Sequence, residues 1–232
     1  MKTVLLSDVH GCLREMKLLL SRVGFSETED TLIFLGDMMD RGFRSYDTFR
    51  YFVALKETMG ERCILCRGNH DHNVLFPPQS RIKNLKWFFS GRVLSDIDFF
   101  LHGERLSSTA PFLEKNTVLY YEEPRFFCVH AALVSERMEE NSLETLLYDH
   151  RETRRNRYQG KLAVTGHIHE LHPHYYAGDR GKGVRIPYGK TLELPKTGII
   201  SIDTGCAELN RLTVMVVEGN HYCLESIHRG GF

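Results

Sequence analysis

The sequence predicts an α/β fold in which two mixed β-sheets pack together as a sandwich, flanked by helices. Strand-like apolar runs alternate with amphipathic segments over the first third of the chain, which is typical of parallel sheets covered by helices. The last third is a series of strand-like runs. With 232 residues, 42% of them hydrophobic, and no repeat or linker, residues 1–232 are expected to form a single domain with a substantial core.

The first third alternates in the order strand, helix, strand, helix, strand. Short apolar runs predict buried strands, and apolar residues at helical spacing predict helices. Ser45 is a candidate N-cap, because its hydroxyl can accept a hydrogen bond from the first helical turn. The predicted elements are strands at 3–7, 31–36 and 63–66, a helix over 11–23 and a helix that Ser45 caps.

The remaining elements are less regular. Residues 80–100 are predicted to be helical, with their aromatic side chains in the core. A hairpin is expected around 122–125, a basic helix over 142–158, and a tight turn at 219–220. Residues 171–197 carry no clear element; a loop of this length is usually functional or disordered, and a strand-rich segment without a functional role is the alternative. The later strands are predicted at 162–167, 198–203, 211–217 and 221–227.

Charge and cysteine usage narrow the functional classes. Lys+Arg and Asp+Glu balance at 30 each, so the chain has no net positive charge that would favour binding to a nucleic acid or an anionic membrane. No apolar run approaches the roughly 20 residues of a membrane span, and no signal peptide is recognised, so a cytoplasmic protein is expected. Cys63 and Cys66 have CxxC spacing, but residues three apart in a strand face opposite sides of the sheet. Buried free thiols are therefore favoured over a zinc site or a redox pair.

Five predicted strands have aspartate, asparagine or histidine at or directly after their carboxyl ends. One such strand end is more often an ordinary hydrogen-bonded turn, but five in one chain favour a shared ligand site, because ligands gather beyond the carboxyl ends of strands in α/β sheets. Mixed oxygen and nitrogen donors suit Mn, Fe, Zn, Ni or Co, and their number favours two ions that share a carboxylate. The polar residues are Asp8, His10, Asp37, Asp40, Arg41, Asn69, His70, His130, His167 and His169.

The segments SDVHG, GDMMDRG, RGNHD, VHA and TGH resemble the motifs of the phosphoprotein phosphatase (PPP) family of calcineurin-like metallophosphoesterases, in its compact bacterial and phage form. The resemblance covers residues 3–217 and implies the same β-sandwich. It also implies a metal-dependent phosphoric-ester hydrolase with two divalent transition-metal ions, Mn²⁺ being favoured.

The resemblance implies a role for each position. Asp8 and His10 would bind the first metal, Asp37 would bridge both, and the second metal would be bound by Asn69, His130 and His167. His70 would be the general acid, oriented by Asp40, while Arg41 would hold phosphate oxygens, and hydroxide formed at the metals would attack phosphorus. Two further assignments are open: His169 is either an extra ligand or a surface residue, and Arg151 competes with Arg154 as the second phosphate-binding arginine.

Two enzymatic functions and one non-enzymatic function fit this reading. The first is a serine/threonine protein phosphatase acting on a phosphorylated protein or a small phosphoester. The alternative is a dinucleoside polyphosphate hydrolase of the diadenosine tetraphosphate type, and a non-catalytic phospho-ligand scaffold is remote. In the long segment after His169, Tyr175, Tyr176 and Arg180 would stack on or pair with a dinucleotide if that were the substrate.

Overall fold

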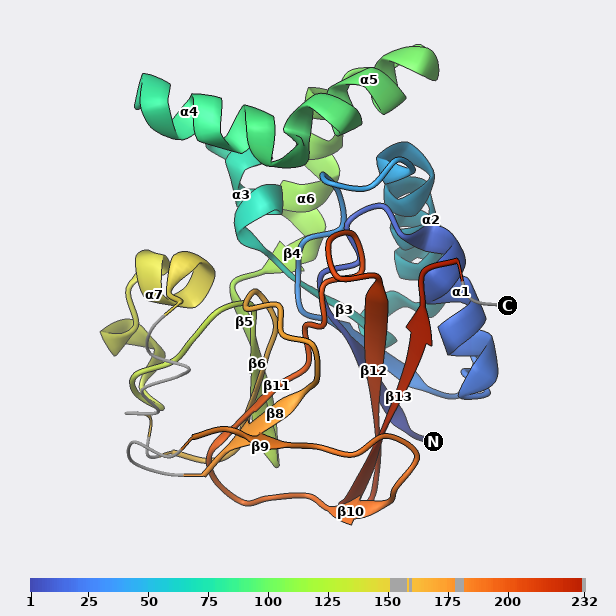
Figure 1. The fold of residues 1–232 in the computed structure, drawn as a ribbon, viewed down its shortest axis with the longest axis vertical. Helices are drawn as coiled ribbons and strands as arrows, with labels where there is room; N and C mark the ends of the chain where they lie inside the picture. Colours follow the sequence, from blue (N-terminus) through green and yellow to red (C-terminus); the bar gives the residue numbers. More distant parts are fainter. Residues whose placement is uncertain (151–157, 159, 178–181, 231–232) are drawn as a thin grey trace.

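The chain folds as a sandwich of two mixed sheets flanked by helices (Figure 1). The computed structural model describes residues 1–150, 158, 160–177 and 182–230. The predicted fold class is confirmed, including the alternating first third and the strand-rich last third.

The first sheet has seven strands in the order β10-β13-β12-β1-β2-β3-β4. The neighbours β1, β2, β3 and β4 are parallel, whereas β12 is antiparallel to β1 and to β13, and β10 is antiparallel to β13. Because β1, β2 and β3 are parallel, their carboxyl ends lie at one edge of the sheet. The strands are β1 Thr3–Leu6, β2 Thr31–Phe34, β3 Cys63–Cys66, β4 Thr117–Val118, β10 Leu192–Glu193, β12 Arg211–Glu218 and β13 His221–His228.

The second sheet has six strands in the order β5-β6-β7-β11-β8-β9. Its central strands β6, β7 and β11 are parallel, while β5, β8 and β9 pair antiparallel with their neighbours. The predicted hairpin is formed by β5 and β6. The strands are β5 Tyr120–Glu123, β6 Phe126–Val129, β7 Ala163–Thr165, β8 His174–Tyr176, β9 Val184–Arg185 and β11 Ile199–Ser201.

Helices cover both outer faces and one end of the sandwich. In Figure 1, α1 and α2 lie on one side, α7 on the other, and α3 to α6 gather at the end where β3 runs into α3. The α-helices are α1 Leu13–Arg22, α2 Ser45–Met59, α3 Asn69–Leu75, α4 Arg81–Trp87, α5 Val93–Leu101, α6 Ala110–Asn116 and α7 Leu143–Tyr148. Shorter turns are η1 Gly60–Arg62, η2 Phe88–Arg92, η3 Leu106–Thr109 and η4 Met138–Glu140, of which η2 is a π-helical turn.

The core has three layers, as the alternation of side chains along a strand requires. One layer fills the space between the sheets, and the others lie between each sheet and its helices. Cys63 belongs to the layer under α1 and α2, and Cys66 to the layer between the sheets. Burial raises the pKa of Cys63 to about 11 and that of Cys66 to about 12. Both are free buried thiols, as predicted.

Three local predictions need correction. Ser45 is the first residue of α2 and not its cap; its hydroxyl instead accepts hydrogen bonds from the backbone N–H of Asp40 and from Ser95 Oγ. Residues 171–197 are not an irregular loop, because they contain β8, β9 and β10. The aromatics of residues 80–100 are not all core: Phe89 and Phe100 are 73% and 77% exposed.

Two other expectations concern the middle of the chain and its surface. The helix expected over 142–158 is described only as α7, which ends at Tyr148; residues 151–157 lie outside the described part. Within the described part of the chain, no helix has both the length and the apolar character needed to cross a bilayer.

Candidate metal centre

At the predicted site, several residues in the loops that follow the strands have an unusual backbone conformation. Seven described non-glycine residues have positive φ angles, a region that L-residues seldom adopt. Six of the seven follow β1, β2 or β7 and belong to the predicted site, and strain of this kind clusters at functional sites. They are Asp8, His10, Asp37, Asp40, Arg41 and His167.

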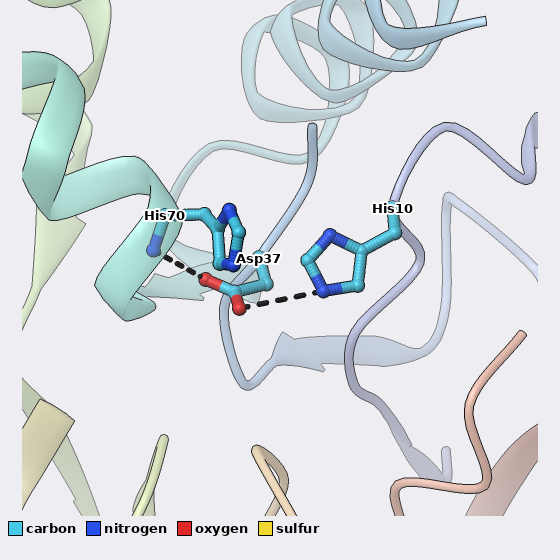
Figure 2. Close-up of side chains that lie close together, drawn as sticks. All are labelled: His10, Asp37 and His70. Carbon is cyan, nitrogen blue, oxygen red and sulfur yellow. Dashed lines mark hydrogen bonds and ion pairs between the residues drawn. The ribbon is translucent and has the colours of Figure 1, made fainter. Parts of the chain in front are cut away.

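Asp37 lies at the centre of the site. Its Oδ2 atom is 3.5 Å from His10 Nε2 and 3.6 Å from His130 Nε2, so one carboxylate lies between imidazoles from two different sheets. Its Oδ1 atom accepts the backbone N–H of His70 at 2.9 Å. Figure 2 shows this carboxylate between the His10 ring and the first turn of α3. Asp8 completes this side, with Oδ1 3.8 Å from His10 Nε2.

The other side of Asp37 is formed by residues that follow β3, β6 and β7. His130 Nε2 lies 2.9 Å from Asn69 Oδ1 and 3.2 Å from His167 Nδ1. The Nδ1 atom of His130 is 2.8 Å from the carbonyl oxygen of Leu35, and His10 Nδ1 is 2.6 Å from that of Met39. These contacts orient both rings so that Nε2 faces the centre, the usual arrangement for metal-binding histidines.

The donor set fits metal ions. His10 Nε2, Asp37 Oδ2 and His167 Nε2 are buried without a hydrogen-bond partner among the described residues, which is costly unless a ligand satisfies them. Candidate ligand atoms within 4.8 Å of one another form three groups among the described residues, of which two, His10–Asp37–His70 and Asp37–His130–His167, share Asp37; the third is Cys12–Glu15–Cys206. Oxygen and nitrogen donors without thiolate suit divalent first-row metals.

The electrostatics of the cluster agree with that fit. Burial, and less strongly the charge of Arg41, holds the pKa of His10 well below its usual range; burial and the neighbouring His130 do the same for His167. Both imidazoles are thus neutral, as ligands must be. Burial raises the pKa of Asp37 well above its usual range, and the nearby carboxylate of Asp8 adds to the effect. A bound cation would relieve this uncompensated cost.

A second set of contacts surrounds His70, which also belongs to the first of the groups that share Asp37. Its Nδ1 lies 2.7 Å from Asp40 Oδ2, and the same oxygen accepts the indole N–H of Trp87 at 2.8 Å. Burial would raise the pKa of Asp40, but hydrogen bonds from His70, Ser95 and Trp87 outweigh it and the pKa is lowered. Burial would lower the pKa of His70, but the carboxylates of Asp37 and Asp40 raise it. The free ring nitrogen, Nε2, is 3.2 Å from Arg41 Nη2.

The last acidic residue of the RGNHD segment supports the loops. Asp71 is fully buried and accepts hydrogen bonds from the backbone N–H groups of Asp37, Gly68 and Met38 at 2.8, 3.1 and 3.2 Å. A Cβ at Gly68 would overlap the Asp37 carboxylate, so this position has room only for glycine. The two residues thus hold Asp37 against the start of α3.

Sequence reasoning missed two acidic residues near the site. Asp203, directly after β11, is buried, and burial together with the charge of Asp8 holds its pKa well above the usual range. Glu208 Oε2 lies 3.1 Å from both Arg41 Nη1 and His169 Nε2. Asp203 is the last residue of the strand predicted at 198–203, so it could have been recognised as another polar strand end; no sequence pattern marks Glu208.

The remaining sequence candidates are His169, the two arginines and the residues of the long segment after His169. His169 pairs with Glu208, and the ligand groups found among the described residues do not include it, so its role as a ligand stays a prediction. Arg151 and Arg154 lie outside the described residues. Tyr176 is buried in the core and Tyr175 is half-buried against it, and the Tyr175 and Tyr176 hydroxyls donate to Thr197 O and Glu170 Oε2. Their contact with a dinucleotide stays a prediction, and Arg180 lies outside the described residues.

The sandwich and the polar residues that follow its strands agree with the comparison with known protein families. The profile of the calcineurin-like phosphoesterase family matches residues 1–171, and the chain belongs to this family.

Individual proteins show the same relationship. The chain is 32% identical over 134 residues to the symmetrical bis(5'-nucleosyl)-tetraphosphatase of Pseudomonas fluorescens (strain SBW25), covering 57% of this chain and 44% of that protein. It therefore spans less than half the length of that relative. A metallophosphoesterase from Sphaerobacter thermophilus has a similar structure, with a TM-score of 0.69, 15% identity and coverage of 99% and 89% of the two chains. A candidate diadenosine tetraphosphatase superposes with a TM-score of 0.63 at 19% identity, covering 98% and 93%.

Proposed function

We propose that the chain hydrolyses dinucleoside polyphosphates of the diadenosine tetraphosphate type, with two divalent metal ions at the Asp37 centre. The reaction class rests on one observation, the two groups of buried ligand atoms that share Asp37. The substrate class is supported by the identity to symmetrical tetraphosphatases. The sequence motifs favoured a protein phosphatase, with a dinucleoside polyphosphate hydrolase as the alternative. We rank the hydrolase above the phosphatase.

The ligands divide into two sets in this proposal. Asp8 and His10 would hold one ion, and Asn69, His130 and His167 the other, with Asp37 shared. When bound, such ions neutralise phosphate charge and activate a water molecule for attack on phosphorus. Manganese remains the favoured ion from the sequence, with iron, zinc, nickel and cobalt as alternatives. The expected single domain and cytoplasmic location also stay predictions.

Three residues of the chain carry the remaining chemistry. Asp40 holds Nδ1 of His70, so Nε2, which accepts a hydrogen bond from Arg41 in this structure, is the ring nitrogen that would carry the proton to the leaving phosphate oxygen. Arg41 presents its guanidinium beside that nitrogen, where it can bind phosphoryl oxygens with two parallel N–H groups. His70 is therefore the proposed general acid, Asp40 its positioning residue, and Arg41 the proposed phosphate-binding residue.

A serine/threonine protein phosphatase is the second candidate. The Asp40-Arg41-Gly42 segment favours it, since this DRG motif is the feature that most resembles the phosphatases. Both candidates use the same centre and differ only in the groups that surround the scissile phosphate.

A substrate panel on manganese-loaded protein separates the candidates. It compares diadenosine tetraphosphate, phosphoserine and phosphothreonine peptides, and p-nitrophenyl phosphate, with Asp37→Asn as the inactive control. We expect the highest kcat/KM for diadenosine tetraphosphate, with ADP as the product because symmetrical cleavage with one water yields two ADP. A kcat/KM for a phosphopeptide well above that for the dinucleotide would reverse the ranking.

A further inference from the structure

A cleft of about 810 Å³ opens beside the metal centre. Asn69 and His70 form its inner end, so the cleft begins at the proposed ligands and the proposed acid. One wall comes from α3, α4 and the turn between them, and the other from α7 and the residues directly after it; these elements occupy the upper and left part of Figure 1. The volume lies within the range of about 300–1,000 Å³ that is usual for small-molecule sites.

An aromatic series lines the cleft. The ring of Phe76 packs against that of His72 with centroids 4.9 Å apart, and His72 in turn meets Tyr148 edge-on at 6.4 Å. Tyr148 donates a hydrogen bond to Asn73 Oδ1 at 2.9 Å, which ties α7 to α3 across the cleft. Phe76 is 58% exposed although His72 supports it from one side, so much of the Phe76 ring remains accessible to a ligand. A base can stack on such a platform, because every base has a π-face.

The outer part of the cleft is cationic. Lys83 and Lys86 lie one turn apart on α4, and both are exposed. Within the described part of the chain, neither ammonium group has an acidic partner, and Glu144 is the one acidic residue among the lining residues. Two unpaired lysines next to a phosphoesterase centre favour an extended anionic ligand over a neutral one.

The cleft also contacts the ligand groups from the α7 side. His150, which lines it, places its ring 4.3 Å from that of His167 at an interplanar angle of 30°. A ligand that extends from the metal centre along this surface would pass His70 and reach Phe76 and the lysines. Tyr176, by contrast, is buried in the core, and Tyr175 is half-buried against it; neither is among the residues that line the cleft.

We propose that this cleft is a nucleotide subsite. It holds one nucleoside arm of a dinucleoside polyphosphate, with the base stacked on Phe76 and the outer phosphates near Lys83 and Lys86. The inference rests on the proposed function, which identifies the phosphate that reacts. The contacts of the cleft itself involve only the base and the phosphate chain. A phosphopeptide would need neither an aromatic platform nor two outer lysines in line.

Kinetics of matched variants test the subsite. The measured quantity is the ratio of kcat/KM for diadenosine tetraphosphate to kcat/KM for p-nitrophenyl phosphate. We expect Phe76→Ala to lower this ratio by about 10- to 100-fold, which corresponds to the loss of one stacked base. We expect a fall of the same size for the double variant Lys83→Glu with Lys86→Glu. The controls are Phe89→Ala and Lys115→Ala, which alter an exposed aromatic and an exposed lysine outside the cleft. The lysine variants lie on the exposed face of α4, so they remain informative if Phe76→Ala is unstable. An unchanged ratio in the lysine variants would overturn the proposal.

Direct binding separates this inference from the proposed function. Titration calorimetry would use a methylene-bridged, non-hydrolysable analogue of diadenosine tetraphosphate with manganese-loaded protein. Affinity lost in the cleft variants but kept in the controls supports the subsite, even if the dinucleotide is turned over slowly. Unchanged affinity in the cleft variants refutes the subsite, even if the dinucleotide is the best substrate.

Discussion

Nδ1 of His70 lies 2.7 Å from Oδ2 of Asp40, and both side chains are almost fully buried. The pair joins the loop after β2 to the first turn of α3, across 30 residues of the chain. Because Asp40 occupies Nδ1, the imidazole can exchange a proton only through Nε2, which faces the site. This relationship makes the proposed acid testable by changing one residue at a time.

Replacing the proposed acid should affect substrates according to their leaving groups. We expect His70→Asn to lower kcat by roughly 10²- to 10⁴-fold for substrates with poor leaving groups, the usual worth of general acid–base catalysis. The loss should be smaller for p-nitrophenyl phosphate, because its leaving group needs little protonation. Asp40→Asn should show the same pattern more weakly. Equal losses for both kinds of substrate would argue against an acid role.

Trp87 should act through the same pair. Trp87→Phe removes the indole N–H that donates to Asp40 Oδ2 while keeping an aromatic ring in the core. A hydrogen bond to a charged group is worth about 1.5–3 kcal/mol, and we expect a fall in kcat of roughly 5- to 20-fold because only part of that energy bears on the orientation of His70. In the double variant with His70→Asn, the second substitution should add little. Additive losses would mean that Trp87 has an independent role.

Metal removal should abolish turnover without unfolding the chain. Protein purified without chelator should contain up to two transition-metal ions per chain by elemental analysis. Dialysis against a chelator should remove activity, and manganese should restore it. Asp37→Asn should reduce the content of both ions, because both ligand groups share this carboxylate. An anomalous map of manganese-soaked crystals without a peak near Asp37 would contradict the proposal.

Glu208 should compete with phosphate for Arg41. Its carboxylate is 3.1 Å from Arg41 Nη1, where a phosphoryl oxygen would bind. We expect Glu208→Gln to strengthen inhibition by inorganic phosphate by about 2- to 5-fold, since a partly exposed ion pair is worth at most about 1 kcal/mol. Glu218→Gln, at an exposed position on β12, is the matched control. Weaker inhibition in Glu208→Gln would show that the carboxylate positions Arg41 productively.

Buried thiols should make the fold sensitive to alkali. The pKa of Cys66 is raised to about 12 by burial, above the value of about 8.5 of a thiol in an unfolded chain. The folded state therefore binds more protons than the unfolded state between these values, and stability is full below the lower pKa and falls as pH rises toward the upper one. Linkage sets the slope near 1.4 kcal/mol per pH unit for each such thiol.

Urea denaturation at pH 8 and pH 10.5 measures this dependence. The free energy of unfolding should be lower at pH 10.5 than at pH 8. Cys66→Ala should make this difference smaller by the contribution of one thiol. Cys223→Ala, at a half-buried thiol, is the control with the weaker expected effect. A wild-type protein equally stable at both values would contradict the assignment.

The sequence by itself predicted the sandwich class and the residues that we propose for the metal centre. Strand and helix periodicity are local properties, and parallel strands necessarily bring their carboxyl ends to one edge. The segments after β1, β2, β3, β6 and β7 could thus be expected to meet before any contact was known. The sequence also marks Gly68 of RGNHD as a turn residue. Only the fold shows that the Asp37 carboxylate occupies the space that a Cβ at Gly68 would need.

Only the tertiary structure decided what surrounds that centre. Trp87 reaches Asp40 across 47 residues, and Glu208 reaches Arg41 from the far end of the chain; no local pattern encodes such contacts. The same holds for Tyr176, which the pairing of β8 with β11 places in the core. Periodicity fixes which face of an element a side chain occupies, whereas the packing of distant elements decides whether that face meets a core, a partner side chain or the open cleft beside His70.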